Sequence, residues 1–175
     1  VSGGEPLPRD LIQPMLDRCG ELWNCYGPTE GTVWTSSQQI MDAAEHILIG
    51  KPMANTTAYV VDEDGNLCPP ETAGDLLVGG DCVTLGYLKR NELTAQKFID
   101  FDGERVYRTG DLARILETGE VEHLGRIDSQ IKLHGHRIEL GEIDVAMKLA
   151  DPDNVRLAAA VVREDRPGDR RPHPI

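Results

Sequence analysis

The chain has 175 residues, of which 39% are hydrophobic and 27% charged, a composition that supports a globular core. Its 18 basic and 30 acidic residues give a formal net charge of −12 at pH 7, which argues against a basic nucleic-acid-binding face and against an anionic membrane surface as partner. The sequence contains neither an apolar run long enough to span a membrane nor a signal peptide, so we expect a cytoplasmic protein.

Residues 1–46 are expected to form the edge of an α/β sheet. Residues 1–5 read as the end of a strand that leads into a turn, and the helical spacing of Leu11, Ile12, Met15 and Leu16 predicts an amphipathic helix over residues 8–18. The pattern predicts further strands at 21–24 and 32–35, separated by a loop at Gly27-Pro28.

Residues 47–124 have a different character, because short β-like runs alternate with turn signals. This pattern is typical of a small antiparallel barrel or sandwich. One helix is expected at 91–98, and Gly79-Gly80 is predicted to be a β-turn rather than a phosphate loop, since no Lys-Ser/Thr pair follows it. Strands are expected at 58–61, 75–78, 105–107, 113–116 and 121–124.

The last part of the chain is predicted to contain a linker at 125–129, a strand at 131–133, a helix at 140–149 and a strand at 157–162. The chain lacks an initiator Met, opens on VSGGEP and ends in the polar, Pro-rich RPGDRRPHPI. We therefore expect it to be a piece of a larger protein.

Three motifs carry most of the functional information: NCYGPTE at 24–30, YRTGDL at 107–112 and GRIDSQIKLHGHRIELGEID at 125–144. In this order and spacing they resemble the core motifs of the adenylate-forming enzymes. The resemblance is closest to the amino-acid adenylation domains of nonribosomal peptide synthetases. It covers nearly the whole chain and fades after residue 165.

The resemblance implies an ATP-dependent, adenylate-forming ligase of secondary metabolite biosynthesis. Such a domain converts an amino acid and ATP into aminoacyl-AMP and pyrophosphate, then transfers the aminoacyl group to the phosphopantetheine thiol of a peptidyl carrier protein. The implied cofactors are ATP and Mg²⁺. The implied fold is α/β plus β: an α/β subdomain ending at residue 46, a β-barrel-like subdomain at 47–124, a hinge at 125–129, and the start of a small α+β domain at 130–175.

The YGPTE segment contains groups suited to a bound nucleotide. A threonine hydroxyl can donate to a phosphate oxygen, and a carboxylate suits Mg²⁺ bound together with phosphates. By itself such a segment is more often a strand-terminating loop with a surface glutamate. The resemblance implies that Thr29 contacts the α-phosphate, Glu30 the metal and Tyr26 the adenine, with Gly27 shaping the turn.

Further nucleotide contacts come from other segments. An aspartate can accept two directional, charge-assisted hydrogen bonds from ribose hydroxyls. The resemblance gives Asp111 that role, although an isolated aspartate after glycine is more often a turn residue. It also implies that Arg126 lies near the ribose and phosphate, and that Gly4 and Glu5 lie beside the adenine and the acyl pocket.

The substrate pocket is expected to use small residues and one indole. A pocket filled largely by Trp34 favours a small amino acid, such as glycine or cysteine. The residues that this chain can supply are Val1, Gly3, Cys25, Val33 and Trp34.

The resemblance also implies a conformational step. Asp128 corresponds to the family's hinge, and Gly135 to the segment that faces the pantetheine arm in the second half-reaction. The family's phosphate loop, its aspartate for the substrate amino group and its late lysine have no counterpart here, so we expect the chain alone to be inactive.

Two alternative functions remain open at this point. One is an acyl- or aryl-CoA ligase of the same superfamily. The other is a non-catalytic remnant that only binds partners.

Overall fold

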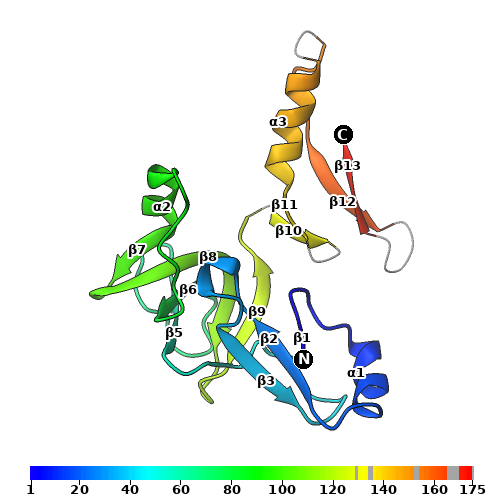
Figure 1. Ribbon diagram of the computed structural model, residues 1–175, viewed down its shortest axis with the longest axis vertical. Helices are drawn as coiled ribbons and strands as arrows, with labels where there is room; N and C mark the ends of the chain where they lie inside the picture. Colours follow the sequence, from blue (N-terminus) through cyan, green and yellow to red (C-terminus); the bar gives the residue numbers. More distant parts are fainter. Residues whose placement is uncertain (129, 134–135, 152–153, 165–169, 175) are drawn as a thin grey trace. The chain divides into compact units, whose positions relative to one another are not determined.

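The computed structural model describes the whole chain except residues 129, 134–135, 152–153, 165–169 and 175 (Figure 1). The chain divides into two compact units, Val1–Ile127 and Asp128–Ile175. Within the described residues, no helix is both long and apolar enough to cross a membrane.

The first sheet has the order β1-β2-β3-β4 and contains one parallel pair. Strand β1 runs parallel to β2, with Gly3 opposite Cys25, and the other neighbours are antiparallel. Helix α1 packs its apolar side on this sheet, as the spacing predicted, and buries Ile12 completely against Leu22 and Ile40. Burial of such a side chain contributes about 1.5–3 kcal/mol. The elements are β1 (Ser2–Gly3), α1 (Arg9–Leu16), β2 (Leu22–Tyr26), the 3-10 helix η1 (Thr29–Gly31), β3 (Ser36–Ile40) and β4 (Lys51–Pro52).

The strand predicted at residues 32–35 is wrong. Thr32 and Val33 have φ values of 54° and 75°, in the left-handed region that β-branched residues rarely adopt. The chain turns there because the Thr35 amide donates to the Tyr26 carbonyl at 2.8 Å, and the strand begins only at Ser36. The run of β-branched and aromatic residues thus forms the turn that joins β2 to β3.

The second sheet is antiparallel and curled, with the order β5-β6-β8-β7 and β9 paired to β8 (Figure 1). It confirms the expected antiparallel β architecture of this part of the chain. Its apolar centre includes Val60, Leu76, Val78 and Val121. The elements are β5 (Thr56–Val61), β6 (Gly74–Gly80), α2 (Asn91–Lys97), β7 (Phe98–Phe101), β8 (Glu104–Ile115) and β9 (Val121–Arg126).

Three details of this sheet differ from the sequence pattern. The strands predicted at 105–107 and 113–116 are one continuous strand, because Gly110, at a φ of 73°, lets β8 bend without ending. Gly79 and Gly80 are not a β-turn but the last residues of β6, paired with Thr57 and Thr56. Strand β9 continues to Arg126, two residues into the range predicted as a linker.

The described residues of the second unit form two antiparallel strand pairs and one helix. Strand β10 (Gln130–Leu133) pairs with β11 (His136–Glu139), α3 spans Leu140–Ala150, and β12 (Ala160–Glu164) pairs with β13 (Arg170–Pro174). The strand predicted at 157–162 starts three residues late, and Leu157 is 81% exposed. The polar tail, from which no strand was predicted, supplies β13.

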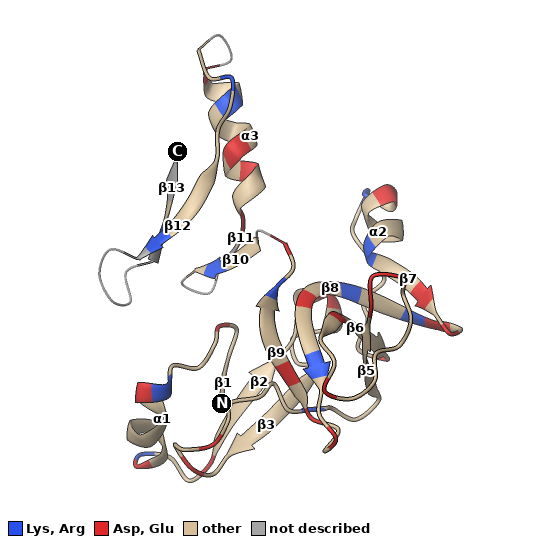
Figure 2. Cartoon of the chain, turned by 180° about the vertical axis from the view of Figure 1, so that it is seen from behind, with Lys and Arg blue, Asp and Glu red and all other residues tan. Residues whose placement is uncertain are grey.

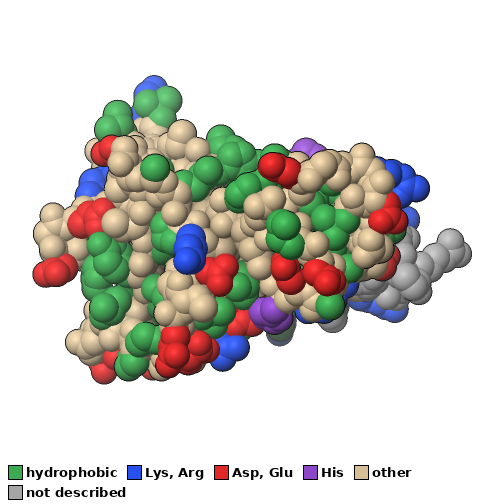
Figure 3. Space-filling model, turned by 90° about the horizontal axis from the view of Figure 1, so that it is seen from below, with side chains coloured by type: hydrophobic (Ala, Val, Ile, Leu, Met, Phe, Trp, Pro, Cys, Tyr) green, Lys and Arg blue, Asp and Glu red, His purple; other side chains and the backbone are tan. Residues whose placement is uncertain are grey.

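Acidic residues recur on the turns of the first unit (Figure 2). On the face seen in Figure 3, acidic and hydrophobic side chains are interspersed without a continuous basic patch among the described residues. This distribution fits the acidic composition.

Candidate nucleotide site

The Asp111 carboxylate is the centre of a buried polar cluster in the first unit. Asp111 is only 5% exposed. Its Oδ2 accepts a hydrogen bond from the Tyr26 hydroxyl, and its Oδ1 lies 2.9 Å from Arg126 Nη1 and 3.2 Å from His123 Nε2. His123 and Arg126 come from β9, which pairs with β8, whereas Tyr26 comes from β2 of the first sheet. The cluster therefore joins residues of both sheets at one carboxylate.

Thr109 and the backbone fix the orientation of this cluster. The Asp111 amide donates to Thr109 Oγ1 at 2.9 Å, and the Thr109 hydroxyl donates to the Leu76 carbonyl at 2.8 Å. Arg126 also donates to the Thr109 carbonyl at 3.0 Å. The register shift between Leu112 and Ala113 bends the strand beside the carboxylate. Asp111 is therefore held by both the strand and its neighbours.

Burial and hydrogen bonding oppose each other at Asp111. Burial by itself raises the pKa of this carboxyl, but hydrogen bonds from His123 and Tyr26 and the charge of Arg126 outweigh it and leave the pKa below its ordinary value. Burial, followed by the adjacent Asp111 charge, raises the pKa of Tyr26 well above its ordinary value. At neutral pH the cluster thus holds a carboxylate and a protonated phenol.

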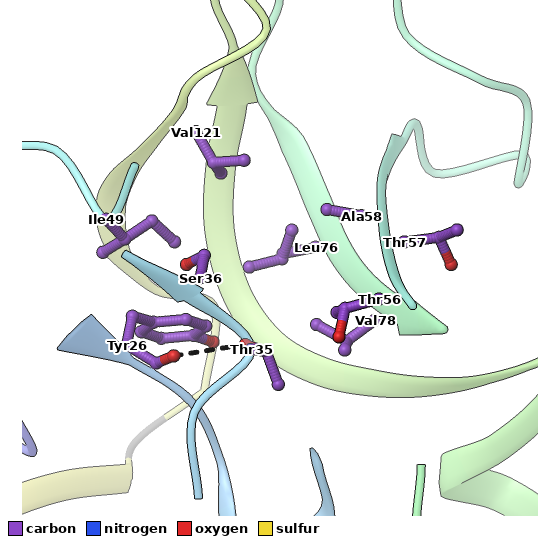
Figure 4. A pocket seen from close by; sticks show the side chains of 10 residues that line it. All are labelled: Tyr26, Thr35, Ser36, Ile49, Thr56, Thr57, Ala58, Leu76, Val78 and Val121. Atoms are coloured by element: carbon purple, nitrogen blue, oxygen red, sulfur yellow. Dashed lines mark hydrogen bonds between the residues drawn. The ribbon is translucent and has the colours of Figure 1, made fainter. Parts of the chain in front are cut away.

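Tyr26 also borders a small internal cavity of about 10 Å³ between the two sheets (Figure 4). Its backbone carbonyl accepts from Thr35 Oγ1 at 3.3 Å. The Ser36 hydroxyl, which lines the same cavity, is buried without a hydrogen-bond partner. This volume is close to the minimum for one water molecule, so the cavity is too small to accept a substrate.

Glu30 lies in η1, the short helix that follows the Gly27-Pro28 turn, and is 6% exposed. Its Oε1 accepts from the Tyr87 hydroxyl at 2.5 Å. Burial, and then this hydrogen bond, raise the pKa of Tyr87 well above its ordinary value. The neighbouring Thr29 is exposed, so its hydroxyl is accessible.

The turn before Glu30 requires glycine at position 27. A Cβ there would lie 2.3 Å from the Val33 carbonyl oxygen and 2.9 Å from the Thr35 amide nitrogen. Only the absence of a side chain lets the 32–35 turn close against this position.

Three of the predicted pocket residues lie together where β1 and β2 pair: Gly3, Cys25 and Trp34. A Cβ at Gly3 would lie 2.6 Å from the Trp34 ring and 2.4 Å from the Cys25 carbonyl oxygen, so the indole covers Gly3 directly. The other two residues, Val1 and Val33, are 79% and 59% exposed. Gly4, with a φ of 90°, and Glu5 continue into the exposed loop after β1.

The structure brings Tyr26, Asp111 and Arg126 together, and places Gly27, Thr29 and Glu30 on the loop that leaves β2.

Asp128 belongs to the second unit, where its Oδ1 accepts from the Gln130 amide at 3.1 Å. Gly135 lies outside the described residues.

Three residues of the site were not predicted from the sequence: His123, Thr109 and Tyr87. Their roles depend on strand pairing and on loop contacts between distant segments. The only local signal was the nearness of Thr109 to Asp111 in YRTGDL.

The chemistry of Glu30 fits a magnesium ion. It is a buried carboxylate with one oxygen already oriented by a hydroxyl, and Mg²⁺ is commonly bound through one or two carboxylates plus substrate phosphates. The described part of the chain contains no cluster of three or more His, Cys, Asp or Glu side chains suited to a metal.

The buried Asp111 carboxylate can accept hydrogen bonds from hydroxyls, and the Glu30 carboxylate suits Mg²⁺ bound with phosphates, so the site contains groups able to bind a nucleotide. Residues 1–88 match the family described as AMP-binding enzyme. Because this match covers 88 of 175 residues, just over half, the chain belongs to the AMP-binding enzyme family.

Individual relatives agree with this assignment. The chain is 43% identical over 174 residues to a dimodular nonribosomal peptide synthase of Bacillus subtilis (strain 168), covering 97% of this chain and 7% of that protein. It is 47% identical over 176 residues to tyrocidine synthase 3 of Brevibacillus parabrevis, covering 97% of this chain and 3% of that protein. The chain thus spans only a small part of the curated relatives it matches.

Solved structures show the same fold. A nonribosomal peptide synthetase protein containing adenylation and PCP domains matches with a TM-score of 0.84 and 32% identity, covering 98% of this chain and 36% of that one. A four-domain nonribosomal peptide synthetase bound to AMP and glycine matches with a TM-score of 0.69 and 41% identity, covering 97% of this chain and 13% of that one. The predicted resemblance to peptide-synthetase adenylation domains and the predicted fold class are confirmed.

Proposed function

We propose that this chain is part of an amino-acid adenylation domain. The domain activates an amino acid with ATP to form aminoacyl-AMP and loads the aminoacyl group onto a peptidyl carrier protein in the cytoplasm. The observation that carries the proposal is the Asp111 cluster, in which a buried carboxylate is kept ionised by Tyr26, His123 and Arg126.

In this proposal Asp111 binds the ribose hydroxyls of ATP. A carboxylate has about four lone-pair sites, and Asp111 already accepts three hydrogen bonds. Two ribose hydroxyls therefore require one present donor to yield. The His123 contact, at 3.2 Å, is the longest of the three and is the one we expect to give way.

Tyr26 lies beside the adenine, and Arg126 beside the ribose and the α-phosphate. Gly4 and Glu5 border the nucleotide and the acyl pocket.

Thr29 donates its exposed hydroxyl to the α-phosphate, and the Glu30 carboxylate holds Mg²⁺. When bound, the metal neutralises phosphate charge as the substrate carboxylate attacks the α-phosphorus and pyrophosphate leaves.

The amino-acid substrate is small in this proposal. The Trp34 indole covers Gly3 beside Cys25, which limits the space between β1 and the 32–35 turn. Val1 and Val33 complete the rim. Glycine, which is bound in one of the solved relatives, and cysteine are the expected substrates.

The second half-reaction requires movement of the small C-terminal domain, residues 130–175, about a hinge at 125–129 that contains Asp128. The preceding parts of the chain, 1–46 and 47–124, are the two subdomains predicted from the sequence. Rotation about Asp128 brings the segment around Gly135 toward the phosphopantetheine thiol of the carrier protein. The thiol displaces AMP from the aminoacyl-AMP and forms a thioester. A division of the chain between Ile127 and Asp128 supports this boundary.

The test is amino-acid-dependent ATP–pyrophosphate exchange by the full-length protein over a panel that includes glycine and cysteine. We expect exchange with one small amino acid and its loss in Glu30→Ala. Glu104→Gln is the matched control and should retain exchange. It alters a carboxylate in the second sheet that accepts hydrogen bonds from the Thr57 and Tyr59 hydroxyls. A folded protein that exchanges with no amino acid would overturn the proposal.

A further inference from the structure

We infer that Tyr87 is a positioning residue for the Glu30 carboxylate, and that residues 82–87, here called the support segment, orient that carboxylate for Mg²⁺ bound to ATP. The inference rests on the proposed function, in which Glu30 holds the metal. It extends that function to a segment that contains none of the predicted nucleotide-site motifs.

Residues 27–35, here called the Glu30 loop, connect β2 to β3. The support segment contacts this loop at three points. The Tyr87 hydroxyl donates to Glu30 Oε1 at 2.5 Å, and the Thr84 amide donates to the Glu30 backbone carbonyl at 2.9 Å. The Thr32 hydroxyl donates to the Cys82 carbonyl at 2.6 Å. Both the side chain and the backbone of Glu30 are therefore held by a segment more than 50 residues away in sequence.

The support segment is itself anchored to the second sheet. Arg105 donates from Nη1 to the Thr84 carbonyl at 2.7 Å and from Nη2 to the Leu85 carbonyl at 2.9 Å. Its guanidinium carbon lies 4.6 Å from the centre of the Phe98 ring, and the Phe98 and Tyr87 rings meet edge to face at 5.5 Å. A planar guanidinium donates from two separate nitrogens while its flat face lies on an aromatic ring, whereas a lysine has one nitrogen and no planar face.

This arrangement compensates for a weak local structure around Glu30. The helix η1 is three residues long and has no side-chain cap at its N-terminus, so it does little to fix the glutamate rotamer. A hydroxyl that donates to one carboxylate oxygen selects the orientation in which the carboxylate meets a metal. Loss of such a supporting hydrogen bond typically weakens metal binding or activity 10–100-fold.

The test measures ATP binding to the full-length protein by isothermal titration calorimetry, over a series of MgCl₂ concentrations and in EDTA. In Tyr87→Phe, we expect the Mg²⁺ concentration needed for half-maximal tightening of ATP binding to rise about 10-fold. ATP affinity in EDTA should be unchanged. Tyr59→Phe, which removes a hydroxyl bonded to Glu104 at 2.6 Å, is the matched control and should leave the Mg²⁺ dependence unchanged.

A double variant separates positioning from general destabilisation. If Tyr87 acts through Glu30, Tyr87→Phe should have no further effect on Mg²⁺ dependence in a Glu30→Ala background. Additive effects of the two substitutions would overturn the inference. If Tyr87→Phe does not fold, Arg105→Lys tests the same support, and the Mg²⁺ requirement should rise because the paired carbonyl contacts are lost.

The remaining outcomes distinguish this inference from the function on which it rests. Mg²⁺-dependent ATP binding in the unsubstituted protein, with the same Mg²⁺ dependence in Tyr87→Phe, would overturn the role of Tyr87 and leave the proposed function intact. Absence of Mg²⁺-dependent ATP binding in the folded, unsubstituted protein would overturn both.

Discussion

Asp111 and Glu30 are both buried carboxylates, 5% and 6% exposed, yet the fold holds them in different ways. Asp111 sits within the long strand β8, and its partners Arg126 and His123 are on the paired strand β9. Glu30 sits on a short helix between strands, and its contacts come from the support segment. Strand pairing positions two of the three partners of Asp111, whereas Glu30 depends on loop contacts that can be lost singly.

The difference suits the two proposed roles. A ribose site needs fixed geometry for directional hydrogen bonds, which a sheet supplies. A metal site must accept an ion that arrives with its nucleotide and retains other oxygen ligands, so some adjustment of the carboxylate is useful. We therefore expect substitutions at Asp111 to affect stability strongly, and substitutions around Glu30 to affect ligand binding more than folding.

The largest effect is expected for Asp111→Ala. The change leaves Arg126, His123 and Tyr26 buried or half-buried without their shared acceptor. Breaking a buried pair by removing one partner costs about 3–5 kcal/mol, and partial exposure of Arg126 places this site near the lower limit. Urea unfolding of the protein measures the loss.

Asp64→Ala, on an exposed turn of the same unit, is the control for Asp111→Ala and should change the free energy of unfolding by less than about 0.5 kcal/mol. Equal losses in the two variants would mean that the Asp111 cluster does not stabilise the sheet.

The second prediction concerns the turn that carries the Glu30 loop. In Gly27→Ala, the added Cβ would lie 2.3 Å from the Val33 carbonyl oxygen, so the 32–35 turn must move. Overpacking of this kind costs about 1–3 kcal/mol. Gly20→Ala is the matched control, because a Cβ there meets no atom within 4 Å. Thermal unfolding of both variants checks the difference, and equal midpoints would contradict the proposed tight closure.

The third prediction uses the acid dependence of the Asp111 site. The pKa of this carboxyl is lowered on folding from its ordinary value of 3.8, so its contribution to stability is present above pH 3.8 and is lost as the pH falls through the folded value. Asp111→Asn should therefore differ most from the unsubstituted protein near neutral pH, and the difference should shrink in acid. Urea unfolding at several pH values measures it, and a constant difference would show that ionisation of Asp111 is irrelevant.

The sequence predicted some residues of the Asp111 and Glu30 sites and missed others. Motif spacing grouped Tyr26, Asp111 and Arg126 as candidate nucleotide-binding residues, and the structure brings these three side chains together. Motif spacing was insufficient to find His123 and Tyr87, because their contacts depend on the β8–β9 register and on a loop whose path is set by Arg105. Local patterns carry no information on which distant strands become neighbours.

Fold prediction failed where tertiary contacts override local propensity. The run TVWT at 32–35 is strand-like by composition, but Gly27 and the Thr35-to-Tyr26 hydrogen bond make it a turn. The opposite error occurred in β8, where two separate strands were predicted at 105–107 and 113–116 but Gly110 lets one strand bend and continue. Strong periodic segments such as α1 and α3 were predicted within two residues of their observed limits.

The smallest effect is expected at Thr32, the third contact between the Glu30 loop and the support segment. Thr32→Val keeps the shape and the β-branch but removes the hydrogen bond to the Cys82 carbonyl. An exposed hydrogen bond contributes about 0.5–1.5 kcal/mol, so we expect a small loss of stability. Thr32→Ser, which retains the hydroxyl, is the control.

Because the contact joins two loops rather than two strands, hydrogen exchange at the Thr84 amide should rise more in Thr32→Val than exchange within β8. Uniform exchange changes in both segments would contradict the idea that the Glu30 loop is held independently of the Asp111 sheet.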